Sequence, residues 1–143
     1  MKFSIFIDKE RDEEVIIYAH ERTKTVDDIE ALVSGAKKSL IGFCEDGAVT
    51  LEPDAVICFA VENNKVFAIT QDGKYKIKQR LYQLEETLPN SFIKINQSCI
   101  ANIKMIKKFD TSLLGTLNVI FINGYSDYVS RRNIKNVKER LGL

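Results

Sequence analysis

The spacing of apolar residues divides the chain into two parts. In residues 2–8 and 15–20, apolar side chains alternate along the sequence, a pattern typical of β-strands. The apolar residues that follow recur at helical spacing, so we predict a helix that Thr25 begins and caps and that Gly35 or its neighbours end. Residues 1–38 are therefore predicted to form a small β-β-α unit. A unit of this length has too little core to be stable alone and should pack either on the remainder of the chain or on a second subunit.

From Ser39 onward the pattern is almost wholly that of short antiparallel strands separated by turns. We predict strands at residues 39–44, 48–51, 55–61, 65–70, 74–77, 103–110, 117–122 and 125–130, and two more within 92–102. Helices are predicted at 78–88, where Pro89 stops the helix, and from Arg131 to Gly142. The fold class is α+β, mainly β, with the second domain at 39–143.

The stretch 92–102 has a polar corner between two runs of β-forming residues, made of Asn96, Gln97 and Ser98. Asparagine and glutamine side chains each present a donor and an acceptor that can pair with an adenine edge. Lys94 and Lys104 flank the corner and could hold phosphates. The alternative is an ordinary surface turn between two strands.

Composition is that of a globular protein, with 45% hydrophobic and 29% charged residues in a chain of 143. The sequence has no apolar run near the roughly 20 residues of a membrane span and no basic-then-apolar leader, so we expect a cytoplasmic protein. Cys44, Cys58 and Cys99 are interpreted as reduced core cysteines. With His20 as the single histidine, neither a zinc site nor a cofactor is expected.

Charge is unevenly distributed along the chain. Residues 1–46 carry seven basic and eleven acidic residues, whereas residues 90–143 carry nine basic and three acidic ones. A basic C-terminal third is expected where a protein meets a polyanion, and an internal match between the two ends is the alternative.

Four segments in fixed order resemble one protein family. They are EPDAVICFAVE at 52–62, DGKYKIKQRLYQLE at 72–85, LPNSFIKINQSCIAN at 88–102, and NG followed by VSRR within 123–132. They are similar to the DI-x-Y-I-E-A strand, the hairpin with its L-x-x-L-E helix, the LP-x-x-F-x-R-I-H-R-S-x-I-V-N segment and the NG…VSRR ending of LytTR-type DNA-binding domains. The resemblance covers roughly the last hundred residues.

The resemblance implies an elongated set of small antiparallel sheets that contacts the DNA major groove from loops. Carried over by position, the base-contact candidates are Lys65, Asn96, Gln97 and Arg132. The phosphate-contact candidates are Asn64, Lys94, Ser98, Lys104, Lys107, Lys108, Arg131 and Asn133. The chain departs from the family at Asn96-Gln97, where the usual pair is His-Arg, which puts the preferred base in doubt.

Each role has a structural alternative. Arg131 or Arg132 could cap carbonyls or pair with Asp127, and the two lysines at 107–108 could be a solvated face. Ser130 is interpreted as a helix cap in preference to a phosphate contact. Asn102 is expected to satisfy buried backbone groups.

These observations favour a stand-alone, sequence-specific bacterial transcriptional regulator that binds double-stranded DNA. An enzyme is not expected, because no poised nucleophile, acid-base pair or glycine-rich phosphate loop is present. The competing class is a β-domain for protein interaction or ligand sensing. RNA binding is not expected, since the candidate loops lack aromatic residues. We also predict a homodimer through residues 1–38, and the resemblance suggests a small membrane protein as regulator.

Overall fold

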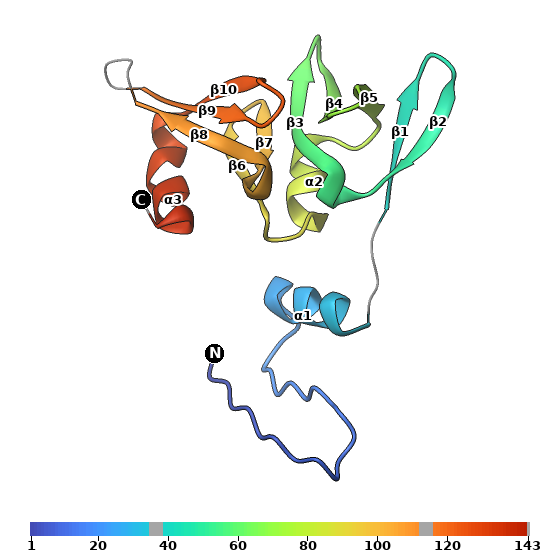
Figure 1. Ribbon diagram of the computed structural model, residues 1–143, viewed down its shortest axis with the longest axis vertical. Helices are drawn as coiled ribbons and strands as arrows, with labels where there is room; N and C mark the ends of the chain where they lie inside the picture. The colour runs from blue at the N-terminus through green and yellow to red at the C-terminus, as the bar shows by residue number, and fades with distance from the viewer. Residues whose placement is uncertain (35–38, 112–115, 143) are drawn as a thin grey trace. The chain divides into compact units, whose positions relative to one another are not determined.

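The computed structural model describes residues 1–34, 39–111 and 116–142, and the chain forms two compact units, Met1–Ala36 and Lys37–Leu143 (Figure 1). Each unit has its own local structure. Within the described ranges, no helix combines the length and apolar character that crossing a membrane requires.

The first unit contains a single regular element in its described part, the helix α1 (Lys24–Ser34). The two strands predicted at 2–8 and 15–20 are wrong, because neither segment pairs with another strand. An isolated strand leaves its backbone groups without partners, so alternation alone does not make a sheet. Val15 and Ile17 instead line a shallow apolar groove together with residues of α1.

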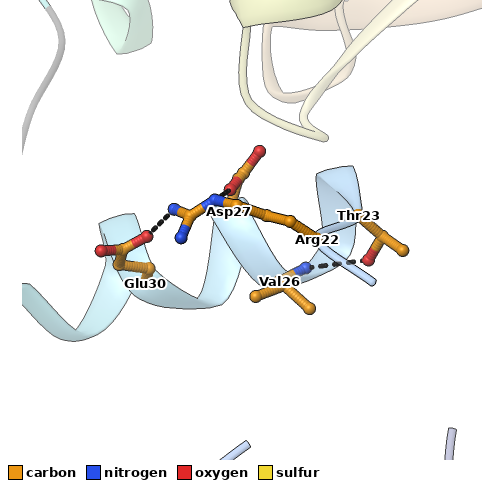
Figure 2. Close-up of polar contacts among 5 residues, drawn as sticks. All are labelled: Arg22, Thr23, Val26, Asp27 and Glu30. Atoms are coloured by element: carbon orange, nitrogen blue, oxygen red, sulfur yellow. Dashed lines mark hydrogen bonds and ion pairs between the residues drawn. The ribbon is translucent and has the colours of Figure 1, made fainter. Parts of the chain in front are cut away.

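The N-terminus of α1 is capped two residues earlier than predicted. The Thr23 hydroxyl, not that of Thr25, accepts a hydrogen bond from the Val26 backbone N–H at 3.3 Å. Figure 2 shows the Arg22 side chain folded back along the helix, where its Nε lies 2.6 Å from an oxygen of Asp27 and its terminal nitrogen bonds Glu30. The predicted helix stop at Gly35 lies outside the described residues.

The second unit is mainly β, as predicted. Its elements are β1 (Leu40–Cys44), β2 (Gly47–Leu51), η1 (Pro53–Ala55), β3 (Val56–Glu62), β4 (Lys65–Thr70), β5 (Lys74–Ile77), α2 (Leu81–Thr87), β6 (Phe92–Asn96), β7 (Cys99–Asn102), η2 (Ile103–Met105), β8 (Ile106–Asp110), β9 (Leu117–Phe121), β10 (Ser126–Val129) and α3 (Arg131–Leu141). They form a seven-stranded sheet in the order β2-β1-β5-β4-β3-β7-β6 and a three-stranded sheet in the order β10-β9-β8, and all pairs are antiparallel.

Two predicted elements are shorter than the sequence pattern indicated. The helix predicted at 78–88 begins at Leu81, because the Gln83 side chain accepts a hydrogen bond from the Arg80 backbone N–H at 2.9 Å and so fixes the helix start. The strand predicted at 103–110 begins with the 3-10 turn η2, and only its second half, β8, pairs with a neighbour.

The seven-stranded sheet has a hydrophobic core on each face. One core lies between this sheet, the second sheet and α3, and includes Ile57, Ile95, Val119, Phe121 and Val137. The other lies on the side of α2 and includes Phe59, Ile77, Leu84, Phe92 and Ile100. Residues of β3 and β7 serve both cores, which explains why apolar side chains occupy both faces of these two strands.

Asn102 has the structural role expected of it. It is fully buried, its amide donates to the Val56 carbonyl at 2.9 Å, and its side-chain oxygen accepts from the Lys104 N–H at 3.1 Å. The prediction that this residue satisfies buried backbone groups is confirmed.

The three cysteines differ in environment. Cys58 and Cys99 are buried in the core, as predicted, whereas Cys44 is exposed at the β1–β2 turn, so its assignment to the core is wrong. A hydrogen bond with Cys58, together with burial, raises the pKa of the Cys99 thiol well above its usual range. Cys99 therefore stays protonated at neutral pH, and a protonated thiol is a poor nucleophile.

Gly42 in β1 provides a test of this packing. A Cβ at position 42 would lie 2.6 Å from Leu51 Cδ1 and 2.7 Å from Tyr75 Cβ. Because the Tyr75 Cβ is attached to the backbone and cannot rotate away, we expect Gly42→Ala to lower the free energy of unfolding by about 1–3 kcal/mol. Urea denaturation measures the change. The exposed Thr50→Ala serves as control, and equal stability of the two variants would contradict the packing described.

Candidate nucleic-acid interface

The first predicted loop is the two-residue turn between β3 and β4. Asn63 and Asn64 have φ of 51° and 62°, the left-handed conformation that asparagine tolerates better than most residues. Directly after them Lys65 pairs with Glu62 in the strand register. Asn64 and Lys65 are exposed, as a DNA contact requires.

A hydrogen bond ties the second loop to the first. The Val61 N–H, at the end of β3, donates to the Ser98 carbonyl in the β6–β7 turn at 2.9 Å. Gln97 and Ser98 are exposed at the tip of this turn. The two loops therefore emerge from the same end of the sheet.

Asn96 differs from its neighbours in the second loop, because it is only 1% exposed. Its amide nitrogen donates to the Tyr128 carbonyl at 2.8 Å and to Asp127 Oδ1 at 3.0 Å, and its side-chain oxygen accepts from the Ser98 N–H at 2.8 Å. With both amide groups engaged inside the protein, Asn96 is placed to hold the turn, and this geometry disfavours the direct base contact predicted for it.

The third loop joins β10 to α3 and is bonded to the second. The Ser130 N–H donates to the Ile95 carbonyl at 2.8 Å. Ser130 occupies the N-cap position, but its hydroxyl accepts from the Asn133 side chain at 2.7 Å instead of from the helix backbone. Asn133 is half-buried by this contact, whereas Arg131 and Arg132 are exposed in the first turn of α3.

Backbone hydrogen bonds thus connect the three predicted loops to one another, and we name their exposed residues the loop cluster. It consists of Asn64, Lys65, Gln97, Ser98, Arg131 and Arg132. Two nearby acidic residues are already engaged, since Glu62 pairs with Lys74 and Asp127 accepts from Asn96 and from the Tyr128 N–H. No ion pair between Arg131 and Asp127 forms in the described part of the chain. The Glu62–Lys74 pair was not anticipated from the sequence, because its members are twelve residues apart.

Four phosphate-contact candidates lie away from the loop cluster. Lys94 is half-buried in mid-strand, opposite Ile100 on the face that packs toward α2. Lys104 follows β7 at the end remote from the β6–β7 turn. Lys107 and Lys108 are exposed on β8, which β9 separates from β10. Lys94 and Lys104 flank the polar corner in the sequence, but strand direction carries them away from the turn.

Comparison with known proteins identifies the β-rich unit. A family model described as the LytTr DNA-binding domain matches residues 46–142. The chain belongs to the LytTR family. This model covers all three loops, the two sheets from the β1–β2 turn onward and the last helix, so the resemblance found in the four sequence segments is confirmed.

Full-length relatives carry names related to transcription. An "Uncharacterized HTH-type transcriptional regulator" of Staphylococcus aureus strain MSSA476 is 36% identical over 100% of this chain and 99% of its own length, and a relative of the same description from strain N315 is equally similar. A solved LytTr DNA-binding domain from Bacillus cereus has a TM-score of 0.71 at 23% identity, and the match covers 76% of this chain and 100% of that domain. This structural likeness confirms the mainly β, LytTR-type fold.

The relatives' name includes the term "HTH-type", which stands for helix-turn-helix, and the fold of this chain differs from that motif. A helix-turn-helix needs two helices joined by a short turn. In the described ranges, the three α-helices are separated from one another by strands. The exposed polar residues of this LytTR domain lie instead on turns between strands and at the start of α3.

The role of Asn96 can be tested by stability. Asn96→Ala removes the partners of the partly buried Tyr128 carbonyl and the Ser98 N–H, and we expect it to lower the free energy of unfolding by about 1–3 kcal/mol. The neighbouring Gln97→Ala changes an exposed side chain and should stay within about 0.5 kcal/mol. Thermal and urea unfolding measure both values. If the two variants were equally stable, Asn96 would not hold the turn.

Proposed function

We propose that this protein is a sequence-specific, duplex-DNA-binding transcriptional regulator that contacts the major groove from its loop cluster. Its LytTR domain, together with full-length relatives named as transcriptional regulators, supports DNA as the partner. A bacterial regulator of this kind acts in the cytoplasm, where the chromosome lies. In the second unit, α2 buries Leu81 and Leu84 and α3 buries Val137 in the cores, which favours contact from turns over contact from a recognition helix.

The observation that carries the proposal is the mutual bonding of the three loops. Backbone hydrogen bonds from Val61 to Ser98 and from Ser130 to Ile95 bring side chains distant in sequence to one edge. This edge presents an exposed amide and exposed guanidinium groups, the chemistry that pairs with base edges. A merely structural edge would not need so many charged and amide groups exposed together.

Individual roles follow from the chemistry of each side chain. Arg132 can present two parallel donors to O6 and N7 of guanine, and Gln97 can pair with N6 and N7 of adenine. Lys65 is a third base-contact candidate at the adjoining turn. Ser98 and Arg131 are assigned to phosphates, which position the protein without specifying sequence. Asn96 acts by holding Gln97 in place.

The second candidate function is a non-catalytic β-domain for protein interaction or ligand sensing. Retention on heparin at low salt separates the two classes, because a basic DNA-binding surface is retained and a plain interaction module is not.

Base preference tests the proposed loop roles. We expect Arg132→Ala and Gln97→Ala each to reduce discrimination at a different base position, by about 1–3 kcal/mol. Selection of bound fragments from a random duplex library, followed by binding to each single-base variant of the selected site, measures this preference. Arg140→Ala and Gln71→Ala are the matched controls, since both residues are exposed at the ends of elements remote from the loop cluster.

Circular dichroism must first show that all four variants are folded. An unchanged preference profile in both loop variants would place the base contacts elsewhere. Failure of the unmodified protein to bind any duplex at low salt would rule out the proposed function itself.

We further propose that the protein is a homodimer built largely through residues 1–38. Several large apolar side chains of this unit are exposed, including Phe3 at 86%, Phe6 at 90% and Ile7 at 91%. On α1, Leu32 is 83% exposed and Val33 is 58% exposed. A second copy would cover these side chains and supply the strand partner that 2–8 lacks within one chain. The family resemblance also suggests a small membrane protein as regulator. We expect such a regulator to act on the same apolar side chains of residues 1–38.

Sedimentation equilibrium of the intact chain at tens of micromolar tests the dimer. We expect a dimer that Leu32→Glu converts to monomer, because a buried carboxylate without a partner is costly. Tyr82→Glu is the matched control on α2, where the side chain is 64% exposed, and it should remain dimeric. A monomeric intact chain, or a dimer that persists when the chain begins at Lys38, would contradict an interface in the first unit.

A further inference from the structure

Three lysines lie at alternate positions along β5 and the residue after it. Lys74, Lys76 and Lys78 therefore point to one face of the seven-stranded sheet. In the strand register Lys76 lies between Phe43 of β1 and Phe67 of β4. The Lys74 ammonium is 4.5 Å from the centroid of the Phe67 ring, and the Lys78 ammonium is 4.7 Å from that of Phe43.

These lysines differ in how far their charge is balanced. Lys74 pairs with Glu62, so its charge is compensated. Within the described ranges, neither Lys76 nor Lys78 has an ion-pair partner. Two exposed, uncompensated cations, one on β5 and one directly after it, form a surface for a ligand that repeats its negative charge.

Strand direction places Lys78 beside the loop cluster. Val66 pairs with Ile77, so the residue after Ile77, Lys78, lies level with Lys65, the first residue of β4. The same end carries the β3–β4 turn and the β6–β7 turn. From β5 to β6 the sheet order counts four strand spacings, or about 19 Å at about 4.8 Å each. This span is roughly half of the ~34 Å helical turn of B-DNA.

The side-chain chemistry favours duplex phosphates over unpaired bases. Single strands bind where aromatic faces are free for stacking. Here the faces of Phe43 and Phe67 are each covered by a lysine ammonium. The aromatic rings position the cations and are not free to receive bases.

We propose that Lys76 and Lys78 bind backbone phosphates of the duplex about half a helical turn from the base pairs contacted by Gln97 and Arg132. The proposal rests on the proposed function and extends the DNA-binding surface across β4 and β5. These contacts carry no base preference. They lengthen the DNA site and add to the salt dependence of binding.

The salt dependence of affinity tests this surface in the intact protein. The double variant Lys76→Gln with Lys78→Gln is compared with a control of equal charge change, Lys138→Gln with Arg140→Gln, whose residues are exposed in the last turn of α3, remote from the loop cluster. The probe is a mixed-sequence duplex of about 40 base pairs, long enough for several helical turns. We expect the slope of log affinity against log salt to become shallower by about 1.8 in the first variant and to be unchanged in the control.

The ratio of the unmodified protein's affinity to that of the glutamine variant should therefore fall about tenfold between about 50 and 200 mM salt. Lys76→Arg with Lys78→Arg should keep the original slope, which separates lost charge from lost fold. Equal slopes for the unmodified protein and the glutamine variant would overturn this inference and leave the proposed function standing. An equal loss of affinity for one separated strand would also overturn it. No duplex binding by the unmodified protein would overturn the proposed function instead.

Discussion

The arrangement of the loop cluster depends on the buried side chain of Asn96. Its amide bonds a turn of the seven-stranded sheet to the last strand of the other sheet. A buried amide that loses its partners has a high free-energy cost, so the two sheets have one favourable alignment in this region. Asn96 therefore fixes the spacing between Gln97 and the arginines of α3, although it is not itself placed to meet a base.

The two cores support this alignment from either side. Central strands whose residues serve both cores cannot shift by one residue without exchanging both faces. The register of β3 against β4 and β7 is therefore strongly specified, and with it the place of every turn at that end of the sheet. The exposed polar residues of these turns can differ among proteins while the scaffold below them is kept.

Most strands of the second unit could be predicted from apolar spacing and turn residues, and β4 and β5 have the predicted bounds. The structure of the first unit could not be predicted in this way. Alternation in residues 2–8 indicates a strand but does not reveal whether another strand exists to pair with it. The three loops were located by resemblance, yet the sequence could not show that Asn96 turns inward while Gln97 remains outside. That difference depends on contacts with Asp127 and Tyr128, more than thirty residues away.

The left-handed turn at Asn63 and Asn64 has a consequence for the thermodynamics of binding. A two-residue hairpin with both φ angles fixed leaves the chain almost no alternative path between its strands. Side chains and loops that must become ordered on association each cost about 0.5–1.5 kcal/mol, and a turn already in its bound conformation avoids most of that cost. Lys65, which follows the turn directly, is thus attached to a backbone whose conformational entropy was lost during folding. The favourable free energy of its contact can therefore appear in affinity with little loss to ordering.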